Sequence, residues 1–307
     1  MKSYGVQNEV KAYCNRLQNE TSVIVTPSLV KTLNDRVESL KKSGVWSQYG
    51  LGFNDRDADS YFQRASVNNL LGRFEVCLFV RGMKTLGLWQ NMVSWPMRSY
   101  QNAGTTTAYS LGGLGTFNGT LENGPTWGAD GMTFDGTNDY INAPSVNFPA
   151  SFTFFLTHKN NAGAKATKPI IGTIGGTSQT NMYFGHTETG TLYGVVWAQA
   201  TAQQLPYNST IASPALGSFE SAAFGYILGS SDFTKNGGSF STRVSDPTTA
   251  LVAQQKTLQI GGNTQNANYF NGQIPFVSLI SQKITKTQHT ALYTLYKSTL
   301  GSSLALP

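Results

Sequence analysis

A series of short alternating segments, separated by turns, fills the chain from about residue 127 onward and constrains its fold more than any other feature. In the stretch WGADGMTFDGTNDYI, Met132 and Phe134 alternate with polar neighbours, and the dipeptides Asp130-Gly131 and Asp135-Gly136 accept positive φ. Similar segments recur with turn signals between them, which is typical of an all-β sandwich or barrel. The further segments expected to be strands are 151–157, 170–174, 181–184, 191–197, 219–228, 239–244 and 257–260.

A second stretch, from Tyr269 to Tyr296, ends this series. The Asn271-Gly272 turn leads into an apolar segment that contains Ile274 and Phe276 and ends at residue 280. A short helix follows, and Thr285 with Gln288 forms a capping box at its start. We therefore expect a last strand and a closing helix.

The two stretches together resemble the laminin-G/concanavalin-like jelly roll, through F-D-G-T-N-D-Y-I in the first and F-N-G-x-I in the second. The resemblance covers roughly residues 22–300. It implies a sandwich of two antiparallel sheets whose first and last strands pair. Segments such as GLWQNMVSWPMRSYQNAG before the sandwich are similar to those of tailed-phage virion proteins, where a helical module precedes the sandwich.

The N-terminal part is expected to be helical. Apolar residues recur at helical spacing in residues 7–18 and again after Thr26-Pro27, which supplies an N-cap and a proline at the first helical position. Residues 65–86 are apolar on more than one face, which favours a buried helix. The second and last of these helices end alike, in Lys41-x-x-Gly44-x-Trp46 and Lys84-x-x-Gly87-x-Trp89. This similarity is explained either by duplication of a helical hairpin or by coincidence.

The expected domains are a helical anchoring module, a connector and the sandwich with its C-terminal helix. The connector is rich in Gly and Thr, so it can form little core by itself. The three ranges are 1–98, 99–126 and 127–307.

Composition points to a hydroxyl-rich sheet protein. Charged residues make up 12% of the chain, about half of the usual 25%. Residues 1–110 hold 13 Lys and Arg against 8 Asp and Glu. We interpret this basic excess as a docking surface or an aid to solubility, with DNA contact as the lesser alternative, because a nucleic-acid site brings a denser patch and a known motif. Cys14 and Cys77 are expected to be reduced and buried.

No targeting signal is recognisable, and nowhere do about 18 apolar residues run together. We expect a soluble protein that is made in the host cytoplasm, is not inserted in a membrane and ends up in a virion.

The segment Asn54-Asp55-Arg56-Asp57-Ala58-Asp59 alternates acids like a calcium loop. Counted from Asp55, however, an EF-hand would need Gly and Glu where Ser60 and Ser66 stand. We favour Asn54 as a helix N-cap with acids in the first turn.

Catalytic patterns are absent from the sequence. Hydrolases of the concanavalin-like fold commonly carry E-x-D-x-E on one strand, but from residue 151 onward the four acids stand far apart and the three histidines are scattered. We therefore predict that the chain is not an enzyme and needs no cofactor, with calcium as the one alternative. The four acids are Glu188, Glu220, Asp232 and Asp246.

Two sets of residues are candidates for binding. Aromatic faces, amides and hydroxyls suit a glycan, while acids near the first strand suit a calcium ion in a loop. The alternative to binding is a structural role for both sets. The aromatic side chains, above all Trp197 and Phe184, would then lie in the core, and the acids would belong to a turn and to the edge of a strand. The glycan candidates are Tyr183, His186, Tyr193, Trp197, Tyr207 and Asn208; the metal candidates are Asp135 and Asp139.

The sequence thus predicts a non-enzymatic component of a phage particle (a decoration, fibre or tail appendage) that docks on other virion proteins and adheres to host surface glycans. The alternatives are a glycan-degrading enzyme of the virion and an architectural cement protein without glycan affinity. A homo-oligomer is compatible with such an appendage, although no coiled-coil heptad demands one.

Overall fold

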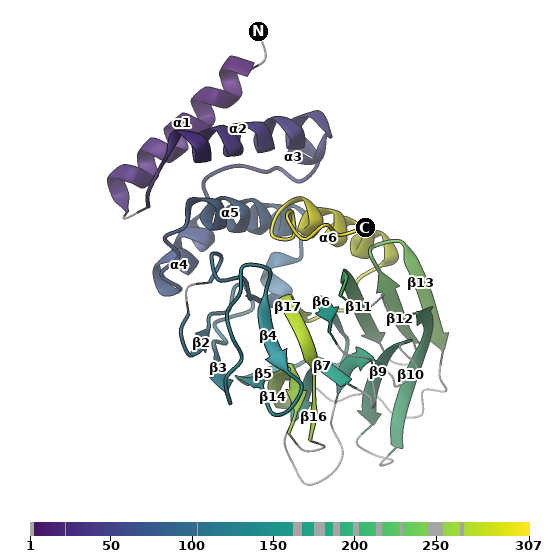
Figure 1. Ribbon diagram of the computed structural model, residues 1–307. Helices are drawn as coiled ribbons and strands as arrows, with labels where there is room; N and C mark the ends of the chain where they lie inside the picture. Colours follow the sequence, from purple (N-terminus) through teal and green to yellow (C-terminus); the bar gives the residue numbers. More distant parts are fainter. Residues whose placement is uncertain are drawn as a thin grey trace.

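The computed structural model describes residues 3–21, 23–102, 104–161, 168–174, 182–186, 191–198, 203–212, 217–227, 230–244, 254–264 and 267–307. Two large antiparallel sheets pack as a sandwich, and helices lie on one side of it (Figure 1). The prediction of a mainly β sandwich preceded by a small helical region is confirmed. The helices are α1 (Ser3–Glu20), α2 (Pro27–Lys42), α3 (Val45–Gln48), α4 (Arg56–Arg64), α5 (Leu70–Thr85), η1 (Trp89–Asn91) and α6 (Lys286–Ser298).

The seven-stranded sheet contains the two stretches that carry the sequence resemblance. Its first predicted strand pairs with its last, with Met132 opposite Ile274, so the expected pairing of first and last strands is confirmed. In order across the sheet, the strands are β1 (Met92–Pro96), β17 (Asn271–Ile280), β6 (Phe152–Asn160), β11 (Phe219–Ile227), β12 (Ser230–Lys235) and β13 (Ser239–Val244), and β4 (Met132–Asp135) also pairs with β17.

The eight-stranded sheet begins and ends with strands that the sequence patterns did not reveal. The predicted connector supplies two strands at one edge, and the strand at the opposite edge was not expected either. In order, the strands are β10 (Gln203–Ala212), β9 (Thr191–Ala198), β8 (Tyr183–His186), β7 (Lys168–Ile174), β14 (Gln254–Ile260), β5 (Tyr140–Phe148), β3 (Gly119–Glu122) and β2 (Thr107–Ala108); β15 (Gly262–Asn263) and β16 (Asn268–Tyr269) form a separate pair.

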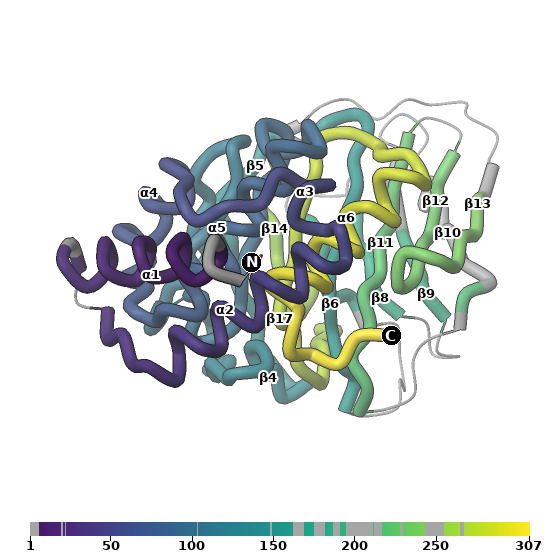
Figure 2. The backbone as a smooth tube through the Cα atoms, turned by 90° about the horizontal axis from the view of Figure 1, so that it is seen from above, coloured from purple at the N-terminus to yellow at the C-terminus, as the bar shows by residue number. Residues whose placement is uncertain are grey.

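Helices α5 and α6 cover the outer face of the seven-stranded sheet. Phe79 of α5 packs on Phe276 of β17, with ring centroids 5.4 Å apart, and Tyr296 of α6 packs on Phe155 of β6 at 5.7 Å. Strands β6 and β17 are therefore buried on both faces along most of their length. Helices α1 to α3 lie over this helical layer (Figures 1 and 2).

The prediction of a buried helix within residues 65–86 is confirmed. Twelve residues of α5 are buried, because the helix lies between the sheet and the outer helices. The cysteines of α1 and α5 are buried free thiols, as expected.

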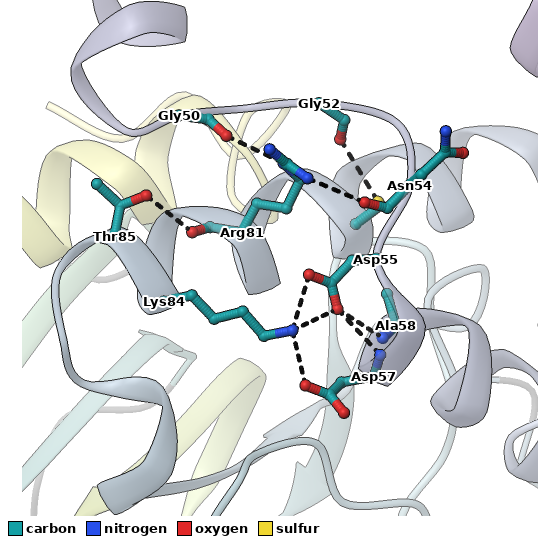
Figure 3. A network of polar contacts seen from close by, with 10 residues as sticks. Gly50, Gly52, Asn54, Asp55, Asp57, Ala58, Arg81, Lys84 and Thr85 are labelled. Atoms are coloured by element: carbon teal, nitrogen blue, oxygen red, sulfur yellow. Dashed lines mark hydrogen bonds and ion pairs between the residues drawn. The ribbon is translucent and has the colours of Figure 1, made fainter.

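A polar junction joins α4 to α5 (Figure 3). Asp55 caps α4 by accepting from the amides of Asp57 and Ala58, so the predicted cap at Asn54 is wrong by one residue. Lys84 of α5 contacts the carboxylates of Asp55 and Asp57, each at 2.7 Å. An ammonium group thus lies where a calcium loop would place the ion.

Among the described residues, no helix is long and apolar enough to span a membrane.

Candidate functional site

Three strands from both sheets bring His158, His186 and Glu220 together inside the sandwich. Glu220 of β11 is the direct register partner of His158 on β6, and His186 comes from β8 of the opposite sheet. The His158 Nε2 atom lies 2.5 Å from His186 Nε2 and 3.2 Å from Glu220 Oε1, and His186 Nε2 lies 4.0 Å from the same oxygen. We call these three residues the His-His-Glu cluster.

Strand periodicity explains why the cluster points inward. Side chains two apart on a strand share a face, and His158 continues the buried row of Phe154 and Leu156. His186 likewise follows buried Phe184. Exposure of the two histidines is 0% and that of Glu220 is 1%, so three polar groups stand at positions that the core pattern reserves for apolar residues.

The electrostatics of the cluster favour a neutral imidazole at His186. Burial, together with nearby His158 and Lys235, holds the pKa of His186 well below its ordinary value. Glu220 faces a cation on its other side, since Lys235 Nζ lies 3.3 Å from Oε2. Within the described part of the chain, neither oxygen of Glu220 has a hydrogen-bond partner. The ion pair with Lys235 compensates Oε2, whereas among the described residues Oε1 faces only the two imidazoles, and a buried carboxylate oxygen in that state is costly.

Two imidazoles and a carboxylate are the donor set of many transition-metal sites, and the candidate ligand atoms all lie within 4.8 Å of one another. Sequence reasoning missed this cluster because it looked for acids on one strand and for histidines near a nucleophile. A signal was present nonetheless: each of the three residues continues an alternating apolar row, as in Phe154-x-Leu156-x-His158.

A second candidate surface lies on the outer face of the eight-stranded sheet. Tyr183 of β8 and Tyr193 of β9 are partly exposed, and their ring centroids are 5.6 Å apart. Their strand neighbours Phe184 and Leu192 are fully buried, so the tyrosines occupy the face that points away from the core. For Phe184 the core alternative is confirmed.

The other predicted glycan residues fall in different places. His186 belongs to the buried His-His-Glu cluster and not to the tyrosine pair. Asn208 of β10 is the register partner of Tyr193, and Trp197 and Tyr207 lie in β9 and β10. The side chains of these last three residues lie outside the described part of the structure.

The predicted metal candidates Asp135 and Asp139 organise a turn. Asp135 accepts from the amides of Thr137 at 2.7 Å and Asn138 at 3.4 Å. Asp139 accepts from the Asp135 amide at 3.0 Å. The amide bonds, above all that of Thr137, lower the pKa of Asp135, whereas burial raises that of Asp139. A calcium ion there stays a prediction.

No protein-family model matches the sequence, and no curated protein matches it. Solved structures do match the fold. Trypanosoma rangeli sialidase in complex with sialic acid is 14% identical, with a TM-score of 0.50, over 69% of this chain and 34% of that one. A mutant of the same sialidase displaying trans-sialidase activity is 14% identical, with a TM-score of 0.50, over 75% and 40%.

A third match is domain 4 of a GH43 extracellular arabinanase from Geobacillus stearothermophilus in complex with arabinotriose, which is 16% identical with a TM-score of 0.41, over 66% of this chain and 87% of that one. The chain spans between about a third and two fifths of the sialidase structures. At such identities these matches concern the fold alone.

The prediction that the chain is not an enzyme is overturned by these matches, because they include sialidases that share its fold. The reason for the error is physical. A missing carboxylate string on one strand says nothing of groups contributed by separate strands, and here three strands bring Glu220 and two histidines within contact distance.

Proposed function

We propose that the sandwich binds carbohydrate on the outer face of its eight-stranded sheet. The observation that carries the proposal is the pair of partly exposed rings of Tyr183 and Tyr193, 5.6 Å apart on neighbouring strands. Aromatic faces pack on the C–H surfaces of sugars, and a wet interface with few aromatic anchors suits such ligands. The fold match to a sialidase in complex with sialic acid supports the same class of ligand.

The experiment is a glycan array probed with the wild-type chain and with a double Tyr183→Ala, Tyr193→Ala variant. We expect binding to sialylated or host-surface glycans that weakens by about tenfold or more in the variant, which corresponds to about 1.4 kcal/mol or more. The matched control is Tyr140→Ala, Tyr269→Ala, because these tyrosines are also partly exposed and have ring centroids 6.4 Å apart. Equal losses in both variants would contradict this placement of the site.

A competing candidate is a glycan-degrading enzyme. The sialidase fold matches favour it over an architectural cement protein. Incubation of the purified chain with host surface polysaccharide separates the candidates: released oligosaccharide indicates degradation, and binding without release indicates adhesion. An array that stays blank, with no released product, favours the cement protein.

A place in a tailed-phage virion is the finer part of this proposal. It rests on the sequence resemblance in residues 87–104, 134–141 and 270–274. In that setting the helical region docks on other virion proteins and the sandwich faces the host. Imaging of the particle with this chain traced tests the placement.

A further inference from the structure

We propose that His158, His186 and Glu220 bind one divalent transition-metal ion of the zinc class, which ties the two sheets together from within. The cluster lies in the interior of the sandwich and the proposed glycan surface lies on its outside. Either proposal can therefore fail without the other.

The donor atoms fit such an ion. Zinc is held by imidazole nitrogen and carboxylate oxygen at about 2.0–2.2 Å, so two ligands of a tetrahedral site lie about 3.3 Å apart. The three separations in the His-His-Glu cluster are 2.5, 3.2 and 4.0 Å. They bracket the required value, and a shift below 1 Å at the closest pair brings the nitrogens to it.

The buried carboxylate gives a second, independent reason. Neither Glu220 oxygen has a hydrogen-bond partner among the described residues, although the side chain is 1% exposed. A metal ion bound at Oε1 would compensate this desolvation, while Lys235 stays beside Oε2 at 3.3 Å. Ligating carboxylates are commonly held by such an outer partner.

The position of the cluster defines what the ion would do. Two ligands come from the seven-stranded sheet and one from the eight-stranded sheet, so a single ion would join strands that are far apart in sequence. Three protein ligands leave one position of a tetrahedral set for water.

The test uses the full chain after metal removal with a chelator, followed by titration with Zn²⁺ against a competing indicator. We expect one equivalent to bind, and Glu220→Gln to weaken binding by at least about 100-fold, because even outer-shell partners are worth 10–100-fold. Co²⁺ should give the visible absorption of a tetrahedral site in the wild type and lose it in Glu220→Gln and in His186→Gln.

The control is His289→Leu, since this third buried histidine lies in α6, away from the cluster. It should bind Zn²⁺ like the wild type. The proposal is overturned if no saturable binding occurs, if Glu220→Gln and His186→Gln bind as the wild type does, or if binding is lost on Asp135→Asn or Asp139→Asn instead.

A second measurement tests the metal site even if a ligand variant fails to fold. Ligands that bind the folded state raise its thermal midpoint, so Zn²⁺ should raise that of the wild type and of His289→Leu. A Lys235→Met variant keeps all three ligands but loses the outer partner of Glu220, so Zn²⁺ should still raise its midpoint, by less than in the wild type. A wild-type midpoint that does not respond to Zn²⁺ contradicts the proposal.

Discussion

All three histidines of this chain are buried and held away from solvent. His158 and His186 face each other, whereas His289 lies in α6 with no hydrogen-bond partner for either nitrogen in the part of the chain that the structure describes. Burial lowers the pKa of His289 to about 4; Lys283 adds to this effect and Asp232 opposes it. The folded protein therefore holds this ring neutral at physiological pH.

This depressed pKa predicts a loss of stability in mild acid. The unfolded chain binds a proton near pH 6.5 and the folded chain only near pH 4, so the unfolded state takes up more protons between these values and the free energy of unfolding falls as pH falls. We expect a loss of about 2–3 kcal/mol between pH 7 and pH 4.5. His289→Leu should remove this part of the pH dependence without costing a hydrogen bond.

Urea unfolding of both chains at several pH values measures the effect. Glu75 must be considered, because burial raises its pKa and its contribution runs in the opposite direction. Since both chains share Glu75, the difference between their slopes isolates His289. Parallel slopes for the wild type and His289→Leu would refute the prediction.

The residues of the candidate sites show how far sequence reasoning reaches at this scale. Alternation places Phe184 in the core and Tyr183 outside it, and both follow from the pattern of β8 alone. The contact between His158 and Glu220 does not follow from any local pattern. It depends on the pairing of β6 with β11, which are far apart in sequence. Local periodicity gives the face of a side chain but not its neighbour on the next strand.

At the scale of elements, the sequence similarity between the C-terminal ends of α2 and α5 has a structural counterpart. Gly44 and Gly87 follow the two helices with φ of 80° and 69°, and their amides donate to the carbonyls of Lys41 and Lys84. Lys41 lies 5.2 Å from the Trp46 ring centroid and Lys84 lies 5.6 Å from that of Trp89. Both helices thus end in the same left-handed glycine and cation–π contact, whether by duplication or by coincidence.

These two glycines predict matched losses of stability. A Cβ at Gly44 or Gly87 would meet no atom within 4 Å, so the cost of alanine comes from the left-handed backbone alone, about 1 kcal/mol at each site. The control is Gly238→Ala, which is exposed and lacks a positive φ and should be neutral or slightly stabilising. Chemical denaturation measures all three variants; a loss in Gly238→Ala equal to the others would contradict the argument.

Some of the strands that the sequence missed are short, although β10, which was also missed, has ten residues. Long alternating or apolar segments were located well, and the predicted strand 239–244 has those bounds in the structure. The two strands β2 and β3 have two and four residues, too short for alternation to emerge from a Gly- and Thr-rich stretch. Backbone pairing of β2 with β3 and of β3 with β5 defines these strands, and their side-chain pattern does not.

At the scale of the whole molecule, the helices share one core with the outer face of the seven-stranded sheet, and a second core lies inside the sandwich. Phe79 of α5, Phe276 of β17, Tyr296 of α6 and Phe155 of β6 form a continuous series of ring contacts, with centroids 5.0 to 6.1 Å apart. Sequence periodicity predicted an all-β sandwich or barrel and a buried helix, and the family resemblance implied two sheets, but neither could show that this helix covers the seven-stranded sheet. The predicted separation into an N-terminal module and a sandwich stays a prediction that folding experiments can test.

Phe79→Ala is that test. Removing this fully buried ring should cost about 3–5 kcal/mol, and because the ring packs on β17, the loss should lower the unfolding midpoint of the sandwich as well as that of the helices. Far-UV circular dichroism reports both kinds of structure. Tryptophan fluorescence reports the buried Trp95 of β1 once the other four tryptophans are replaced by Phe. In this background the two transitions should coincide without further change and should move together when Phe79→Ala is added. The control is Val37→Ala, a buried residue of α2, which should cost less because fewer atoms are removed. A variant in which the helical signal melts early while Trp95 keeps its wild-type midpoint would mean that helices α1 to α5 fold apart from the sheets.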